Sequence, residues 1–171
     1  ALLFTGPRGV GRSRMIDAAA LEGKLANAIV LRADAEGAET SAWGTARALL
    51  EQLVTEAPTK AAELLQLRAA VLCHVWPRAL ELTGARPRVF QRDRELRPAI
   101  QQELLELVTD LTRHAFVLIT ADDVDRVDEP SRAFLALLAE RAPGQRLLLV
   151  GAVADDASSA GFEDLAVLQS R

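Results

Sequence analysis

Three continuous apolar runs constrain the fold of this chain more than any other feature. They cover residues 1–5, 115–120 and 146–154. Runs of this length without polar alternation are typical of strands buried on both faces, which occur in parallel sheets covered by helices. Helical patterns separate the runs, and alternating strands and helices predict an α/β fold. We therefore expect a three-layer α/β domain built on a parallel sheet.

The other elements follow from helical periodicity and from the positions of glycine and proline. A helix is expected over residues 12–22, with Gly23 as its stop, and a strand over residues 27–34. Asp128 suits the N-cap of the last predicted helix. The remaining predicted helices cover residues 45–56, 60–82 with a break at Pro77, 98–113 and 130–141.

Composition places the chain among globular domains. Half of its 171 residues are hydrophobic, which excludes a disordered polar chain and supplies the core of one domain. The formal net charge of −4 argues against direct nucleic-acid binding. The single cysteine, Cys73, excludes an internal disulfide and fits a cytoplasmic protein. The sequence also lacks an apolar run long enough to span a membrane.

The two ends of the sequence predict a domain taken from a larger protein. The chain enters directly in an apolar strand, without an initiator methionine, and it stops without a closing element. We therefore expect residues 1–171 to form a single domain excised from a longer multidomain protein.

The segment GPRGVGRS, residues 6–13, has the spacing of the phosphate-binding loop G-x-x-x-x-G-K-[ST]. Its glycines allow the backbone to turn with N–H groups inward, and the following helix adds its positive end. Ser13 supplies a hydroxyl suited to Mg²⁺. Arg12 stands where the motif carries lysine. The candidate phosphate-binding residues are Gly6, Pro7, Arg8, Gly9, Val10, Gly11, Arg12, Ser13 and Arg14. The alternative is a glycine-rich turn that binds nothing.

Asp122 and Asp123 follow the apolar run at residues 115–120. Ligands of parallel α/β sheets bind beyond the carboxyl ends of the strands, so this segment and the loop are expected to converge on one site. For that reason we expect strands 1–5 and 115–120 to be adjacent at the centre of the sheet. Paired carboxylates there can hold magnesium and orient an attacking water. The alternative is that they only solvate a strand end.

Four stretches of the sequence resemble a known family, the P-loop ATPases. LLFTGPRGVGRSRMI is similar to the opening strand and phosphate loop, and AWGTARALLEQL to the helix after the second strand. FVLITADDVDRVDEPSRAFLALLAER is similar to the acidic strand with its helix, and RLLLVGAVADD to the sensor strand. The resemblance is to AAA-type ATPases similar to origin-recognition proteins and to signal-transduction (STAND) ATPases. Such modules occur in large bacterial regulators, often beside a serine/threonine kinase domain, a cyclase or a DNA-binding domain. The resemblance implies a P-loop NTPase fold, truncated at its C-terminal side.

The resemblance also implies ligands and residue roles. ATP or ADP would bind with Mg²⁺, and Ser13 and Asp122 would hold the metal while Asp123 orients the attacking water. Two positions depart from the family: Arg12 replaces the lysine, and Ala154 stands where the sensor strand often ends in arginine. We therefore expect an ATP/ADP-binding regulatory switch with weak or lost hydrolysis, acting on neighbouring domains of its chain. The alternative is a structural or interaction domain that keeps the fold without binding nucleotide.

Overall fold

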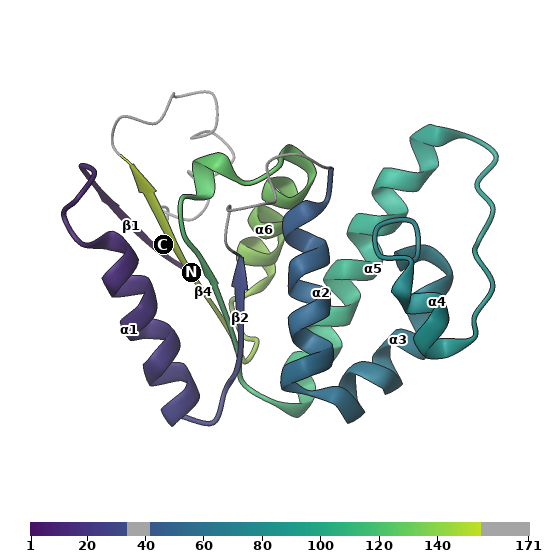
Figure 1. The fold of residues 1–171 in the computed structure, drawn as a ribbon, viewed down its shortest axis with the longest axis horizontal. Coiled ribbons are helices and arrows are strands. Elements are labelled where there is room, and N and C mark those ends of the chain that lie inside the picture. The colour runs from purple at the N-terminus through teal and green to yellow at the C-terminus, as the bar shows by residue number, and fades with distance from the viewer. Residues whose placement is uncertain (34–41, 155–171) are drawn as a thin grey trace.

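The computed structural model describes residues 1–33 and 42–154, which form a sheet with helices on both sides (Figure 1). Residue 34, the last of the predicted second strand, lies outside these ranges. The strands are β1 (Leu2–Gly6), β2 (Ile29–Ala33), β3 (Val117–Ala121) and β4 (Leu147–Ala154). The helices are α1 (Arg12–Leu25), α2 (Gly44–Glu56), α3 (Pro58–Leu72), α4 (Arg78–Thr83), α5 (Asp93–His114) and α6 (Glu129–Arg141), with a short 3₁₀ helix η1 (Val124–Arg126) after β3. Within the described ranges, every helix is too short or too polar to cross a bilayer.

All strand pairs are parallel, in the order β1-β4-β3-β2, so the predicted parallel α/β architecture is confirmed. The expected adjacency of strands 1–5 and 115–120 is wrong, because β4 lies between β1 and β3 and pairs with both. Burial follows this order: β4 is buried along almost its whole length, whereas β1 has exposed residues. The carboxyl ends of β1 and β3 therefore lie at the same edge but two strand spacings, or about 10 Å, apart.

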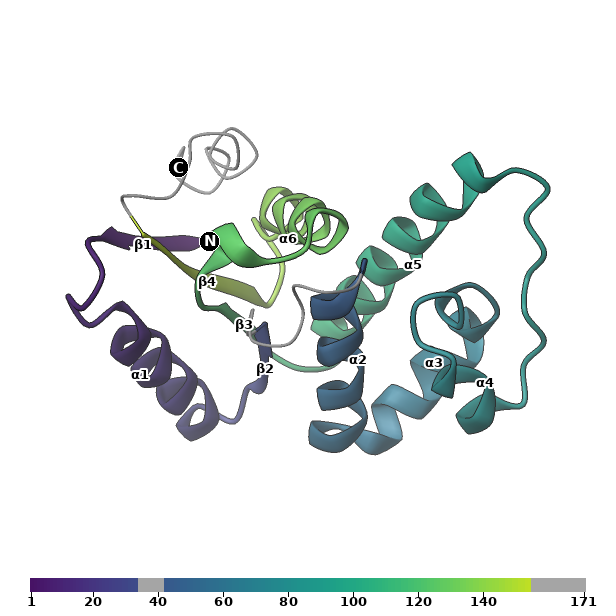
Figure 2. The same cartoon turned by 45° about the horizontal axis from the view of Figure 1, so that its top comes forward.

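Side chains of the central strands alternate between two apolar layers. Leu118 and Val150 pack with Ile16 of α1 on one face. Ile119 and Leu149 belong to the larger core on the other face. Figure 2 shows α1 on one side of the sheet and α2, α5 and α6 on the opposite side. Both faces are thus covered, as the uninterrupted apolar runs predict.

Gly23 lies inside α1, so its predicted role as a helix stop is wrong. A Cβ atom at this position would lie 2.5 Å from Leu118 Cδ2 and 3.1 Å from Val30 Cγ2. Both of these side chains come from the sheet. Gly23 therefore allows α1 to approach the sheet closely, and the helix continues to Leu25 before it ends.

The predicted break at Pro77 is confirmed, because α3 ends at Leu72 and Pro77 is the N-cap of α4. The helix expected from Pro98 begins earlier, at Asp93. Asp93 and Glu95 place negative charge in its first turn, where the helix dipole favours it. Pro98 removes one backbone hydrogen bond near this exposed end, where water can solvate the carbonyl that loses its partner.

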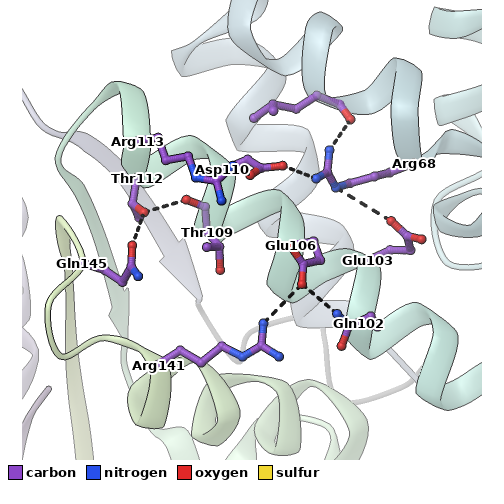
Figure 3. A network of polar contacts seen from close by, with 11 residues as sticks. Arg68, Gln102, Glu103, Glu106, Thr109, Asp110, Thr112, Arg113, Arg141 and Gln145 are labelled. Carbon is purple, nitrogen blue, oxygen red and sulfur yellow. Dashed lines mark hydrogen bonds and ion pairs between the residues drawn. The ribbon is translucent and has the colours of Figure 1, made fainter.

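Ion pairs join α5 to the helices on either side of it (Figure 3), buried toward α3 and exposed toward α6. Arg68 of α3 is only 6% exposed and pairs with Asp110 of α5, while its Nε lies 3.8 Å from Glu103 Oε2. Glu106 of α5 lies 3.6 Å from the guanidinium of Arg141 on α6. α5 therefore connects the outlying helices α3 and α4 to the part of the domain that carries the sheet.

We predict that Arg68→Ala lowers the free energy of unfolding by about 2 kcal/mol, because it removes the buried cation beside Asp110 and Glu103. The loss is smaller than for a fully buried pair, because Asp110 keeps Arg113 at 2.7 Å. The matched control is Arg78→Ala, which removes an ion pair with Glu51 whose side chains are 51% and 41% exposed. An exposed pair contributes less than about 1 kcal/mol. Urea unfolding followed by circular dichroism measures both values. Equal losses in the two variants would contradict the structural role of Arg68.

One carboxylate fixes the starts of both α2 and α6. Asp128 Oδ1 accepts hydrogen bonds from the backbone N–H of Ser131 at 3.0 Å and of Trp43 at 2.8 Å. Asp128 Oδ2 accepts a third from the N–H of Thr45 at 3.1 Å. The predicted N-cap of α6 is thereby confirmed. The bonds to α2 also hold Trp43, whose φ of 66° is left-handed and uncommon for a bulky residue.

We predict that Asp128→Ala lowers the free energy of unfolding by at least about 2 kcal/mol, since it removes a helix cap and leaves further buried N–H groups without acceptors. Asp128→Asn should cost less, because its amide oxygen can still accept hydrogen bonds. Glu129→Ala is the control: this neighbouring acid is 57% exposed and pairs with Arg97. Thermal and urea unfolding give the three values. A loss for Asp128→Ala no larger than that for Glu129→Ala would refute the shared cap.

Candidate functional site

The loop between β1 and α1 has the backbone form that the glycine spacing predicts. Gly9 and Gly11 have φ angles of +85° and +101°, which other residues rarely adopt. A Cβ atom at either position would meet no heavy atom within 4 Å. Glycine is therefore required here by the backbone conformation. The space beside the loop is open.

The start of α1 is suited to an anion. Its N-cap, Gly11, provides no side-chain hydrogen bond, and its first turn contains no acidic residue. The first N–H groups of a helix lack partners within the helix and carry its positive end. Ser13 and Arg14 lie in this turn and are exposed, as is Arg8 in the loop. The predicted phosphate-binding segment thus has backbone donors and basic side chains at one place.

Arg12 is directed toward the ends of the strands. It is 9% exposed, and its Nη1 donates hydrogen bonds to the carbonyls of Gly6 and Val153, the latter at 2.9 Å. Its Nη2 lies 3.5 Å from Asp123 Oδ1. One side chain thus connects the end of β1, the end of β4 and the loop after β3. The sequence motif predicts a basic group at this position but gives no indication of these contacts.

The two acidic residues differ in their surroundings. Asp122 is half-buried and its Oδ1 accepts a hydrogen bond from the N–H of Asp123 at 3.0 Å. Asp123 has a left-handed φ of 44° and its carboxylate is 40% exposed. This carboxylate lies between two cations, Arg12 at 3.5 Å and Arg126 at 3.9 Å. The structure therefore brings Arg12 and Asp123 together, while the metal role of Ser13 and Asp122 stays a prediction.

The end of β4 offers only backbone polar groups. Ala154 is buried and lies in register with Gly6 at the end of β1. The carbonyl of the preceding residue, Val153, already accepts a hydrogen bond from Arg12. Thr120, near the end of β3, has a buried hydroxyl without a hydrogen-bond partner.

The donor set fits a magnesium ion that is shared with a phosphate. Within residues 1–33 and 42–154, there is no cluster of three or more histidine, cysteine, aspartate or glutamate side chains able to hold a metal. Mg²⁺ commonly takes one or two protein oxygens and completes its shell with water and substrate phosphates. Ser13 and Asp122 could supply those two oxygens, and the bound nucleotide would supply the rest.

Comparison with protein families agrees with these features. The model of the AAA ATPase domain family matches residues 1–150, from β1 through the loop and the acidic strand into β4. The curated proteins provide no match to the chain. The family match covers most of the sequence and includes both segments that form the candidate site. The chain therefore belongs to the AAA ATPase domain family.

Proposed function

We propose that this domain binds ATP and ADP with Mg²⁺ and acts as a regulatory switch whose hydrolysis is slow or lost. The observation that carries the proposal is the position of Arg12. Its guanidinium contacts two backbone carbonyls and Asp123 beside an open phosphate-binding loop. Binding depends mainly on the loop, and turnover depends on the groups that Arg12 engages.

Nucleotide binding is supported by features that do not involve the Arg12 side chain. The loop backbone from residue 6 to residue 14 offers N–H groups, and α1 adds its positive end. The Ser13 hydroxyl and the Asp122 carboxylate would hold Mg²⁺, which neutralises phosphate charge when it is bound. These groups are available whichever basic residue follows Gly11.

Slow turnover follows from the groups nearest to the reacting phosphate. A lysine is a compact point charge, whereas arginine is a planar, bulkier fork that cannot occupy the same space. Arg12 and Asp123 also pair with each other, so each must give up that contact before it can act at the phosphate. Charge stabilisation at a transferring phosphate contributes several kcal/mol, and each 1.4 kcal/mol or so is a factor of about ten in rate.

The partners of such a switch would be neighbouring domains of the same protein. The sequence resembles modules of large bacterial regulators, where a kinase or a DNA-binding domain often lies beside the ATPase. We propose that ATP and ADP change the contacts of this domain with those neighbours in the cytoplasm.

We predict saturable binding of a fluorescent ATP analogue that strengthens with Mg²⁺, together with ATP turnover below about 1 s⁻¹, the low end of ordinary enzyme rates. Gly11→Val should abolish binding, because a β-branched residue is strained at a φ of +101°. The matched control is Gly84→Val, which places valine at another glycine with positive φ, +67°, at the end of α4. If the native protein binds no analogue, the domain is a structural module and the proposal fails.

We predict that Asp122→Asn weakens Mg²⁺-dependent binding at least about tenfold, equivalent to about 1.4 kcal/mol, while affinity without Mg²⁺ stays unchanged. Asp123→Asn should instead reduce whatever hydrolysis the native protein shows. Asp93→Asn, at the exposed start of α5, is the control for both variants. Analogue titrations with and without Mg²⁺ and a phosphate-release assay provide the measurements. Unchanged Mg²⁺ dependence in Asp122→Asn would show that the metal assignment is wrong.

A further inference from the structure

The protein neutralises the charge of Arg12 only in part. The side chain is almost completely removed from water. Its two hydrogen-bond acceptors, the carbonyls of Gly6 and Val153, are neutral. Its carboxylate partner, Asp123, lies 3.5 Å away, is 40% exposed and is shared with Arg126. A buried cation with such partners retains much of its desolvation cost, so a phosphate within reach is a better partner.

We propose that nucleotide binding is transmitted to the end of β4 through Arg12. We call the contacts of Arg12 with Gly6, Val153 and Asp123 the latch. These contacts connect the ends of β1 and β4 and the loop after β3, and we assign them to the protein before nucleotide binds. When a nucleotide occupies the loop, the guanidinium turns to the terminal phosphate and releases Val153 and Asp123. This inference rests on the proposed nucleotide binding and names how that binding is transmitted.

A phosphate competes with the contacts that Arg12 makes in this structure. An arginine has five N–H donors in one fixed plane. Nη1 is used by the carbonyls of Gly6 and Val153, and Nη2 faces Asp123. The second Nη2–H and the Nε–H remain, and together they can form a side-on bidentate pair with a phosphate. Because Nη2 also faces Asp123, an anion bound there lies close to that carboxylate and repels it. Phosphate binding by Arg12 therefore weakens the contact with Asp123.

The latch acts where the chain leaves the sheet. Gly6 and Ala154 are register partners, so β1 and β4 are joined at this edge by the strand ladder and, one residue earlier on β4, by Arg12. Releasing Arg12 removes the second connection and leaves Asp123 with Arg126 as its ionic neighbour. The position of Ala154 then depends on whether nucleotide is bound. A neighbouring domain attached beyond this strand can respond to that change.

Hydrogen–deuterium exchange of the whole chain tests the latch, with a non-hydrolysable ATP analogue and Mg²⁺ as the probe. In the native protein we expect the analogue to speed exchange at the last residues of β4, 151–154, and to leave α5 unchanged. In Arg12→Lys, which lacks the planar fork, these amides should exchange faster even without the analogue, and the analogue should change them little. The affinity of Arg12→Lys should rise at least about fivefold, because the competing contacts are gone.

Two further variants separate the contacts of the latch. Asp123→Asn removes only the ion pair and should give intermediate exchange at β4; asparagine tolerates the left-handed φ of 44° at this position. Arg126→Lys keeps all three contacts of Arg12 and should respond to the analogue as the native protein does. This variant controls for a general change in charge near Asp123.

The outcomes distinguish the latch from nucleotide binding itself. If native protein and Arg12→Lys both bind the analogue and show the same change at β4, the latch is wrong and the binding proposal stands. If neither binds the analogue, the proposed function fails. The free proteins still test the contact in that case, since equal β4 exchange in native protein and Arg12→Lys would overturn the latch without any ligand.

Discussion

Helices cover both faces of the sheet and keep water away from the central strands β3 and β4. The backbone N–H and C=O groups of these strands must therefore form their hydrogen bonds with neighbouring strands. Each therefore has a parallel neighbour on both sides, and all carboxyl ends meet at one edge. This constraint places the loop before α1, the acidic residues after β3 and the end of β4 together. The site is a consequence of strand direction, although its parts are far apart in the sequence.

The edge is held together by two polar residues that work in different ways. Asp128 satisfies backbone N–H groups at the starts of α2 and α6 and is fully used as a structural cap. Arg12 bonds backbone carbonyls of β1 and β4 but keeps a charge that is only partly neutralised. The first arrangement is complete without a ligand. The second is open to competition from an anion, which makes it suited to a switch.

The replacement of lysine by arginine at residue 12 has a compositional background. Only two of the 20 basic residues are lysines, Lys24 and Lys60, so arginine is favoured throughout the chain. Composition explains how arginine reached this position but does not fix what it does there. Its length and its planar fork allow it to span carbonyls on two strands and to approach Asp123 on a third segment. A lysine ammonium carries its three donors on one nitrogen and lacks the spread fork that places donors on two nitrogens for that arrangement.

The sequence by itself determined the strands, the parallel sheet, the glycine-dependent loop, the cap at Asp128 and the break at Pro77, because each follows from local periodicity, backbone freedom or capping chemistry. It located the candidate site residues, whose metal-binding and catalytic roles stay predictions. Only the tertiary structure decided that β4 separates β1 from β3, since every buried run is equally apolar and does not specify its neighbours. It likewise decided that Gly23 packs against Leu118 and that Arg12 turns toward Val153. Those outcomes depend on distances between segments far apart in the chain, and a local pattern carries no information about them.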